Sequence, residues 1–156
     1  MAKRGQIELR VNGQQYMLEV DPGRLLLEVL REELGLYSVR EGCGIGVCGT
    51  CTILLDGRPV SSCLMLVGQV HGRAITTVEG LASDGTLHPI QQAFLANFAF
   101  QCAYCTPGFL LTAAALRNAG EPLNEETLRV ALSGNLCRCG CYLRIWKAVC
   151  AALASP

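Results

Sequence analysis

The chain has 156 residues, with 13 basic and 13 acidic side chains and therefore no formal net charge. Nothing in this balance indicates the strongly basic surface that binds nucleic acid or an anionic membrane. Hydrophobic residues make up 51% of the chain, whereas charged residues make up 17%, below the roughly 25% of ordinary soluble domains. We therefore expect some apolar surface to be covered by a protein partner.

No stretch of the sequence is apolar for long enough to cross a membrane as a helix. The most apolar run, FLLTAAAL at residues 109–116, is far shorter than the roughly 18–20 residues that a spanning helix needs. Near the N-terminus, Lys3 and Arg4 are followed neither by an apolar segment nor by the cleavage site of an export signal. We expect a first strand near this end, no membrane span and a cytoplasmic location.

The first half of the chain is typical of short strands joined by tight turns. Asn12-Gly13 and Asp56-Gly57 each separate two short apolar runs, and both dipeptides favour a two-residue hairpin turn. Leucines at helical spacing predict one helix between the two hairpins. We predict a small mixed sheet with one packed helix: strands at 7–11, 16–20, 52–55, 59–63 and 74–78, and a helix at 25–34.

The composition changes after about Gly80, and the polar segment LASDGTL at residues 81–87 is the predicted boundary. Beyond it the pattern is helical. Thr106 is the predicted N-cap of one helix, with Pro107 in its first position, and Asn124 is the predicted N-cap of another. The four predicted helices are 89–98, 107–118, one that begins at 124, and 142–153. The fold class is therefore α+β, with a strand-rich domain at 1–80 and a helical domain at 81–156.

Cysteine is the most informative residue type in this sequence. Ten cysteines without a secretion signal favour metal ligation over a disulfide framework. Most of them also fall in groups at short spacings. These groups are Cys43 with Cys48 and Cys51, Cys102 with Cys105, and Cys137 with Cys139 and Cys141.

The first group has the spacing of a plant-type ferredoxin. Cys43-x4-Cys48-x2-Cys51 is followed at a distance by Cys63, which is the pattern that binds a [2Fe–2S] cluster. The surrounding glycines tolerate positive φ and let backbone N–H groups approach the cluster. A structural zinc site usually shows two separated C-x2-C pairs, whereas this group has one. The sequence therefore predicts a [2Fe–2S] cluster on these four cysteines.

The second group is ambiguous by spacing alone. Cys102-x2-Cys105 and the distant Cys137-x-Cys139 suit zinc as well as iron, and Cys141 adds a fifth candidate thiolate. The predicted helix after Cys105 would direct its positive end toward that thiol and favour an anionic cluster.

Three strings resemble one known family. They are REGCGIGVCGTCTILLDGRPVSSC (residues 40–63), QCAYCTPGF (101–109) and LSGNLCRC (132–139). Together they resemble the small iron–sulfur subunit of molybdenum hydroxylases, the family of xanthine dehydrogenase, aldehyde oxidoreductase and aerobic carbon monoxide dehydrogenase. Their order and spacing match over nearly the whole chain.

The resemblance implies a fold, a ligand set and partners. It implies a β-grasp ferredoxin-like domain followed by a four-helix bundle, with one [2Fe–2S] cluster in each. The molybdenum-pterin cofactor would lie on a large catalytic subunit and an FAD on a medium subunit. Gln101 resembles the residue that hydrogen-bonds the pterin, and Cys139 the ligand whose sulfur also approaches it. The implied ligands are Cys43, Cys48, Cys51 and Cys63 for the first cluster, and Cys102, Cys105, Cys137 and Cys139 for the second.

One position departs from the family pattern. The family commonly has CRCTGY where this chain has CRCGCY, from Cys137 to Tyr142. Ligation by Cys141 in place of Cys139 is therefore an open alternative, although the C-x-C spacing of the family is kept. Otherwise Cys141 and Cys150 are expected to be small buried residues.

These observations support an electron relay within a larger molybdenum enzyme. No nucleophile–base pair, phosphate loop or dinucleotide motif is visible, so no catalytic residue for substrate chemistry is expected on this chain. Two alternatives stay open: a free-standing, diffusible ferredoxin, and an interaction module that zinc stabilises. The substrate and the final electron acceptor depend on other chains.

Overall fold

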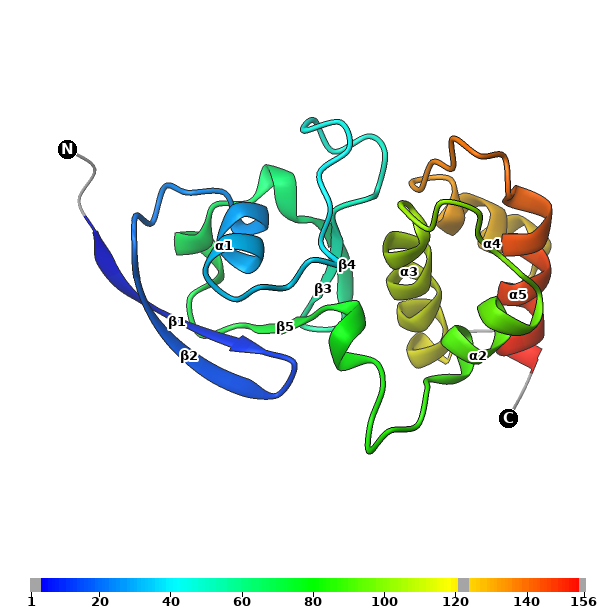
Figure 1. The fold of residues 1–156 in the computed structure, drawn as a ribbon, viewed down its shortest axis with the longest axis horizontal. Helices are drawn as coiled ribbons and strands as arrows, with labels where there is room; N and C mark the ends of the chain where they lie inside the picture. Colours follow the sequence, from blue (N-terminus) through cyan, green and yellow to red (C-terminus); the bar gives the residue numbers. More distant parts are fainter. Residues whose placement is uncertain (1–3, 121–123, 155–156) are drawn as a thin grey trace.

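The computed structural model describes residues 4–120 and 124–154. Every strand lies in the first half, and four helices follow it (Figure 1). The strand that was expected near the N-terminus begins at Gly5, and residues 1–3 lie outside the described part. No helix in the described ranges has both the length and the apolar character for a membrane crossing.

The five strands form one mixed sheet in the order β2-β1-β5-β3-β4. β1 pairs antiparallel with β2 and parallel with β5, and β3 pairs antiparallel with both β4 and β5. The mixed sheet predicted from the sequence is thus confirmed. The strands are β1 Gly5–Val11, β2 Gln14–Val20, β3 Thr52–Leu55, β4 Arg58–Ser61 and β5 Ala74–Thr76.

Both predicted hairpin turns are present. Asn12 and Gly13 have φ angles of 52° and 80°, and Asp56 and Gly57 have φ angles of 49° and 80°. Positive φ at both central residues is the conformation of a two-residue turn whose twist matches the strands. Asn, Asp and Gly tolerate this conformation best, which is why the sequence located the turns correctly.

Helix α1 (Leu26–Glu32) packs against the sheet and is shorter than predicted. Leu26, Leu27, Val29 and Leu30 are buried, because the helix presents them to the strands. The core that they share with the sheet and its connections contains Ile7, Leu9, Val11, Val20, Val39, Cys51, Ile53, Leu55, Cys63, Val67, Val70 and Ile75.

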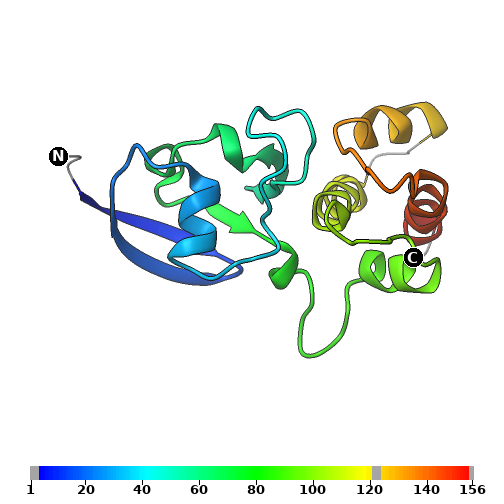
Figure 2. The same ribbon diagram turned by 45° about the horizontal axis from the view of Figure 1, so that its top comes forward.

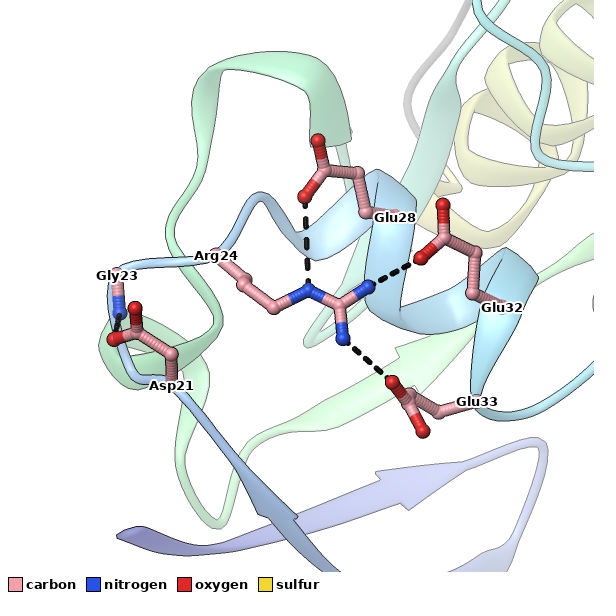
Figure 3. Close-up of polar contacts among 6 residues, drawn as sticks. All are labelled: Asp21, Gly23, Arg24, Glu28, Glu32 and Glu33. Carbon is pink, nitrogen blue, oxygen red and sulfur yellow. Dashed lines mark hydrogen bonds and ion pairs between the residues drawn. The ribbon is translucent and has the colours of Figure 1, made fainter. Parts of the chain in front are cut away.

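Arg24 ties the start of α1 to its end (Figure 3). Its guanidinium lies 2.5 Å from carboxylate oxygens of both Glu32 and Glu33, and its Nε lies 3.7 Å from Glu28. The hydrogen bond to Glu33, followed by the nearby negative charges, raises the pKa of Arg24. The group therefore stays charged and fixes the connection that leads from β2 into the helix.

Two predicted strands end earlier than expected. β4 ends at Ser61, because the next residue, Ser62, donates from Oγ to the carbonyl oxygen of Cys51 at 2.7 Å and closes the strand pair. Cys63 therefore lies in a 3-10 turn, Ser62–Leu64, and not in the strand. β5 ends at Thr76 because the Asn12 side chain takes over the hydrogen bonding of Thr77, with both contacts at 2.9 Å. Residues Val78–Gly80 form another 3-10 turn instead of strand.

The second half is a four-helix unit with its own core. Its helices are α2 Pro89–Ala96, α3 Thr106–Ala119, α4 Glu125–Leu132 and α5 Tyr142–Ala154. The buried residues between them include Ile90, Phe94, Phe109, Leu128 and Ile145. α3 is the helix that faces the sheet half (Figures 1 and 2). The predicted α+β class, with a strand-rich part followed by a helical part, is therefore confirmed.

The helix N-caps were predicted with mixed success. Asn124 caps α4 as predicted, since its Oδ1 accepts from the Thr127 N–H at 2.8 Å. The prediction for α3 was wrong by one residue: Cys105 is the N-cap, and Thr106 is the first helical residue. Thr106 Oγ1 is buried and has no hydrogen-bond partner within the described residues, so the hydroxyl does not cap the helix.

Candidate functional site

Four cysteines of the first half, which we call the N-terminal set, surround one loop. Cys43, Cys48 and Cys51 lie on the segment between α1 and β3, and Cys63 reaches the same place from the 3-10 turn after β4. Cys51 and Cys63 are buried, whereas Cys43 and Cys48 are half-buried. The loop thus covers one pair of thiols and leaves the other closer to its surface.

The glycines of this loop are required by its path. Gly44, Gly46 and Gly49 have φ angles of 67°, 74° and 67°, a region that other residues adopt at a cost. A Cβ atom on Gly46 would also lie 2.4 Å from the Leu64 side chain. This path directs backbone N–H groups inward, and the N–H of Val47 donates to Cys43 Sγ at 3.3 Å.

The thiols of the N-terminal set interact as two pairs. Hydrogen bonds from the backbone N–H groups of Ile45 and Cys48, with a further one from the Cys48 thiol, lower the pKa of Cys43 to about 6. Burial, followed by a hydrogen bond with Cys51, raises the pKa of Cys63 to about 11. Cys43 therefore pairs with Cys48, and Cys51 pairs with Cys63.

Four cysteines of the helical half form the C-terminal set. Cys102 and Cys105 lie between α2 and α3, while Cys137 and Cys139 lie between α4 and α5. Cys102 Sγ and Cys139 Sγ are 3.4 Å apart, and Cys105 is hydrogen-bonded to Cys137. This set therefore also consists of two pairs, each with one thiol from each connecting segment.

Backbone donors and burial act in opposite directions on the C-terminal set. The N–H of Tyr104, 3.5 Å from Cys102 Sγ, and then the Cys139 thiol lower the pKa of Cys102. Burial, followed by the hydrogen bond with Cys137, raises the pKa of Cys105 to about 12. Burial also opposes ionisation of Cys137, but hydrogen bonds led by the Cys141 N–H lower its pKa.

The donor chemistry of both sets fits a two-iron cluster. A [2Fe–2S] cluster takes four cysteine thiolates, two on each iron, and its potential depends on hydrogen bonds to the sulfurs. Each set offers two pairs of thiols together with backbone N–H groups aimed at them. Within residues 4–120 and 124–154, no three cysteine, histidine or carboxylate side chains converge on one point as ligands of a single ion.

The two sets line a common cavity of about 410 Å³. Cys43 and Cys48 of the N-terminal set and Cys102, Cys105 and Cys137 of the C-terminal set all contribute to its wall. The loop that carries the first set and the segment before α5 lie side by side there (Figure 2). Groups bound by the two sets would therefore be close neighbours.

A buried polar contact joins the two halves beside this cavity. Asn135, which is 4% exposed, donates from Nδ2 to the carbonyl oxygen of Gly49 at 3.1 Å. Its Oδ1 accepts from the hydroxyl of Thr112 on α3 at 3.0 Å. A Cβ atom on Gly108 would lie 2.1 Å from the carbonyl oxygen of Gly49, so α3 touches the cysteine loop directly.

Tyr104 and Arg40 make further contacts across the junction. The Tyr104 hydroxyl donates to the carbonyl oxygen of Glu41 at 2.6 Å, and the Arg40 guanidinium donates to the carbonyl oxygen of Ala103 at 2.5 Å. The sequence-based prediction missed these contacts and those of Asn135. The one available signal was a polar Asn135 between apolar Leu132 and Leu136, which indicates a buried amide with partners.

The remaining candidate residues lie near the C-terminal set. Gln101 is exposed and precedes the exposed Cys102. Cys139 contacts Cys102, whereas Cys141 is buried and contacts Cys137. Cys150 is half-buried on α5.

Two family models cover most of the chain. The model of the 2Fe-2S iron-sulfur cluster binding domain matches residues 9–75, and that of the [2Fe-2S] binding domain matches residues 77–150. Each match contains one of the two cysteine sets.

Named relatives match over nearly their whole length. The nicotinate dehydrogenase small FeS subunit of Eubacterium barkeri is 48% identical over 143 residues, which cover 92% of this chain and 91% of that protein. The xanthine dehydrogenase iron-sulfur-binding subunit of Escherichia coli O157:H7 is 43% identical, with coverage of 92% and 91%. In the crystal structure of quinoline 2-oxidoreductase from Pseudomonas putida 86, a chain with 39% identity superposes with a TM-score of 0.91 over 97% of this chain and 94% of that one.

Proposed function

Because the chain belongs to the small iron–sulfur subunits of the molybdenum hydroxylase family, we propose that its two cysteine sets each ligate one [2Fe–2S] cluster. The single observation that supports this most strongly is the gathering of eight thiols into two sets of four, with members of both sets lining one cavity. The proposed ligands are Cys43, Cys48, Cys51 and Cys63 for the N-terminal set, and Cys102, Cys105, Cys137 and Cys139 for the C-terminal set.

The chain is the electron-transfer subunit of an oxidoreductase complex. When bound, the two clusters supply one-electron redox chemistry between a molybdenum-pterin site and FAD or another acceptor. The residues of this chain hold the thiolates, exclude water from Cys51, Cys63 and Cys137, and direct backbone N–H groups at the sulfurs. Such hydrogen bonds and such burial are what tune the potential of an iron–sulfur site.

The proposed orientation places the C-terminal set toward the molybdenum-pterin site. In its support, Cys102 and the neighbouring Gln101 are exposed and Cys139 is half-buried, whereas two ligands of the N-terminal set are buried. An exposed amide such as Gln101 offers both a donor and an acceptor to a pterin ring. Gln101 and Cys139 are thus the residues proposed to meet that cofactor.

The partners follow from the names of the relatives. Those relatives are subunits of dehydrogenases and oxidoreductases, and we propose for this chain a large molybdopterin-binding catalytic subunit and a medium FAD-binding subunit. We also propose a cytoplasmic location, which the ten free thiols support, because disulfides are rare in reducing compartments. The proposed domain limits are 1–80 and 81–156, supported by the two separate hydrophobic cores.

The two alternatives have less support. A diffusible ferredoxin would have relatives that act alone, whereas the named relatives are subunits of larger enzymes. A zinc-stabilised module lacks support because both matching family models describe [2Fe–2S] domains.

Iron analysis and EPR spectroscopy of the reduced protein test the proposal. Two [2Fe–2S] clusters require about four irons per chain and two distinct signals. Cys63→Ser should remove the signal of the N-terminal set and Cys102→Ser that of the C-terminal set, each with about half of the iron. Cys150→Ser, which changes a cysteine outside both sets, should retain both signals. Stoichiometric zinc, or a single signal in the native protein, would contradict the two-cluster assignment.

A further inference from the structure

Thr50 carries a buried hydroxyl that lies against one of the proposed ligands of the N-terminal set. The residue is 4% exposed, and its Oγ1 lies 3.1 Å from Cys48 Sγ, within hydrogen-bond distance of a sulfur. Within the described residues, this sulfur is the one hydrogen-bond partner of the hydroxyl. The hydroxyls of Thr52 and Ser62, which are also buried, donate instead to backbone carbonyl oxygens. Thr50 is therefore the buried hydroxyl of this region that reaches a cysteine sulfur.

Gly42 leaves the room that this contact needs. A Cβ atom on Gly42 would lie 2.8 Å from Cys48 Sγ and 2.9 Å from Thr50 Oγ1. The backbone of Gly42 therefore packs against both atoms and limits the movement of the hydroxyl. Gly42, Cys48 and Thr50 also line the cavity that the two cysteine sets share. The contact thus lies on the side of the N-terminal set that faces the C-terminal set.

The chemistry of the two groups gives the direction of the hydrogen bond. A threonine hydroxyl carries one proton to donate, and it is not among the side chains that titrate. A cysteine that ligates iron does so through its thiolate sulfur, which accepts hydrogen bonds. With Cys48 as a ligand, the hydroxyl of Thr50 is therefore the donor.

We propose that Thr50 is a positioning residue of the N-terminal set: its hydroxyl donates a hydrogen bond to Cys48 Sγ and raises the reduction potential of the cluster held there. This inference rests on the proposed function. One-electron reduction adds negative charge to the thiolate sulfurs, so a donor to one of them stabilises the reduced form more than the oxidised form. The burial of Thr50 strengthens the effect, since water does not compete for its hydroxyl.

The C-terminal set differs in its donors. Its sulfurs receive the backbone N–H groups of Tyr104 and Cys141, just as Cys43 receives that of Val47. In the part of the chain that the structure describes, no side-chain hydroxyl lies within hydrogen-bond distance of a sulfur of the C-terminal set. Thr50 therefore raises the potential of one cluster alone, which favours electron transfer from the C-terminal set toward the N-terminal set.

The test is a redox titration of the full-length chain with its clusters assembled, followed by EPR. The native protein must first show about four irons and two signals; failure at this step contradicts the proposed function itself. Thr50→Val removes the hydroxyl and keeps the volume of the side chain. It should lower the equilibrium constant for reduction of the N-terminal cluster by about threefold to tenfold, where tenfold is about 59 mV for one electron, and leave the C-terminal cluster unchanged.

Two further variants make the result specific. Thr50→Ser keeps a hydroxyl and should hold the potential near the native value. Thr52→Val makes the same change in the same segment, where the hydroxyl donates to the Gly49 carbonyl oxygen at 2.7 Å, and should leave both potentials unchanged. An unchanged N-terminal potential in Thr50→Val, an equal shift of both clusters, or an equally low potential in Thr50→Ser would overturn the proposal.

A third variant covers the case in which Thr50→Val does not assemble its N-terminal cluster. Thr50→Ala then replaces it, because the smaller side chain also lacks the hydroxyl and cannot crowd the Cys48 sulfur. The same fall in the N-terminal potential is expected. Loss of the N-terminal iron in both variants would overturn the proposal, because Thr50 would then be required for assembly of the cluster and not for its potential.

Discussion

The backbone N–H of Leu136 donates a hydrogen bond to the carbonyl oxygen of Cys48 at 2.9 Å. Leu136 directly precedes Cys137, so a main-chain contact joins a residue of the N-terminal set to the segment that carries the C-terminal set. Asn135 makes the adjacent contact to Gly49. The two sets are therefore held together by direct contacts at this junction as well as by the connecting segment between β5 and α2.

Asn135→Ala should weaken the junction. The change removes the acceptor of the buried Thr112 hydroxyl and one donor to the Gly49 carbonyl oxygen, which keeps its hydrogen bonds from Thr52. We expect a loss of about 1–3 kcal/mol in the free energy of unfolding. Denaturant titration measures this loss, and EPR of the reduced protein should show a weaker magnetic interaction between the clusters. Asn124→Ala is the matched control: it removes an exposed cap, costs about 1 kcal/mol and leaves that interaction unchanged. An unaltered interaction in Asn135→Ala would contradict the role given to this amide.

Gly49→Ala should be far more damaging than an equivalent change at Gly57. Both residues have positive φ, at 67° and 80°, so both variants bear a backbone cost of roughly 1–2 kcal/mol. At Gly57 nothing lies within 4 Å of the added Cβ, whereas at Gly49 it would lie 2.3 Å from the Gly134 carbonyl oxygen. We expect Gly57→Ala to bind about four irons and Gly49→Ala to lose iron from both sets. Equal stability of the two variants in thermal denaturation would show that the junction accommodates the added methyl group of Gly49→Ala without loss of stability.

Glu79→Gln should change the acid stability of the first half. Burial opposes ionisation, but hydrogen bonds from Ser38 and Thr77, at 2.5–3.0 Å, lower the pKa of Glu79. A lowered pKa stabilises the fold at pH values above the unfolded pKa, about 4.3, and this contribution is lost as the pH falls through the folded value. Because solvent still reaches this residue, we expect a difference of about 1 kcal/mol or less at neutral pH. When unfolding is measured between pH 7 and pH 3.5, the difference in unfolding free energy between the native chain and Glu79→Gln should shrink below about pH 4.3. A difference that stays constant with pH would show that it does not come from the ionisation of Glu79.

Arg24→Ala should lower stability in a salt-dependent way. The guanidinium contacts three carboxylates, and its loss leaves Glu28, Glu32 and Glu33 to repel one another. Exposed ion pairs contribute about 0.2–1 kcal/mol each, so we expect a loss of about 1–2 kcal/mol at low salt and less at high salt. Arg129→Ala, which removes a single exposed pair with Glu125 at 2.8 Å, is the control with a smaller effect. Equal losses in both variants would mean that the three-carboxylate contact adds nothing.

Local sequence patterns predicted the local structure well. Asn12-Gly13 and Asp56-Gly57 located the hairpin turns, and Asn124 located the start of α4, because each conformation depends on only a few neighbouring residues. The cysteine spacing likewise led to the loop that surrounds Cys43, Cys48 and Cys51. Where a prediction concerned residues close together in the chain, it was generally correct.

Contacts between distant residues limited the prediction. β5 ends early because Asn12, 65 residues before Thr77, takes over its hydrogen bonds. The predicted N-cap of α3 was wrong by one residue, and the segment that leads into this helix contacts the other half through Ala103 and Tyr104, which no local pattern reveals. The residues around Asn135 form no local pattern from which Gly49 could be identified as its partner. The junction between the two cysteine sets was therefore not predicted.

The contact between Asn135 and Gly49 spans 86 residues of sequence. During synthesis the loop with Cys48 and Gly49 leaves the ribosome long before the segment with Cys137 and Cys139. The first half can therefore fold while the second is still being made, and its loop carbonyls then serve as a template for the last two thiols. The junction itself can form only after synthesis has passed Asn135, so it is among the last contacts between the two halves to be made.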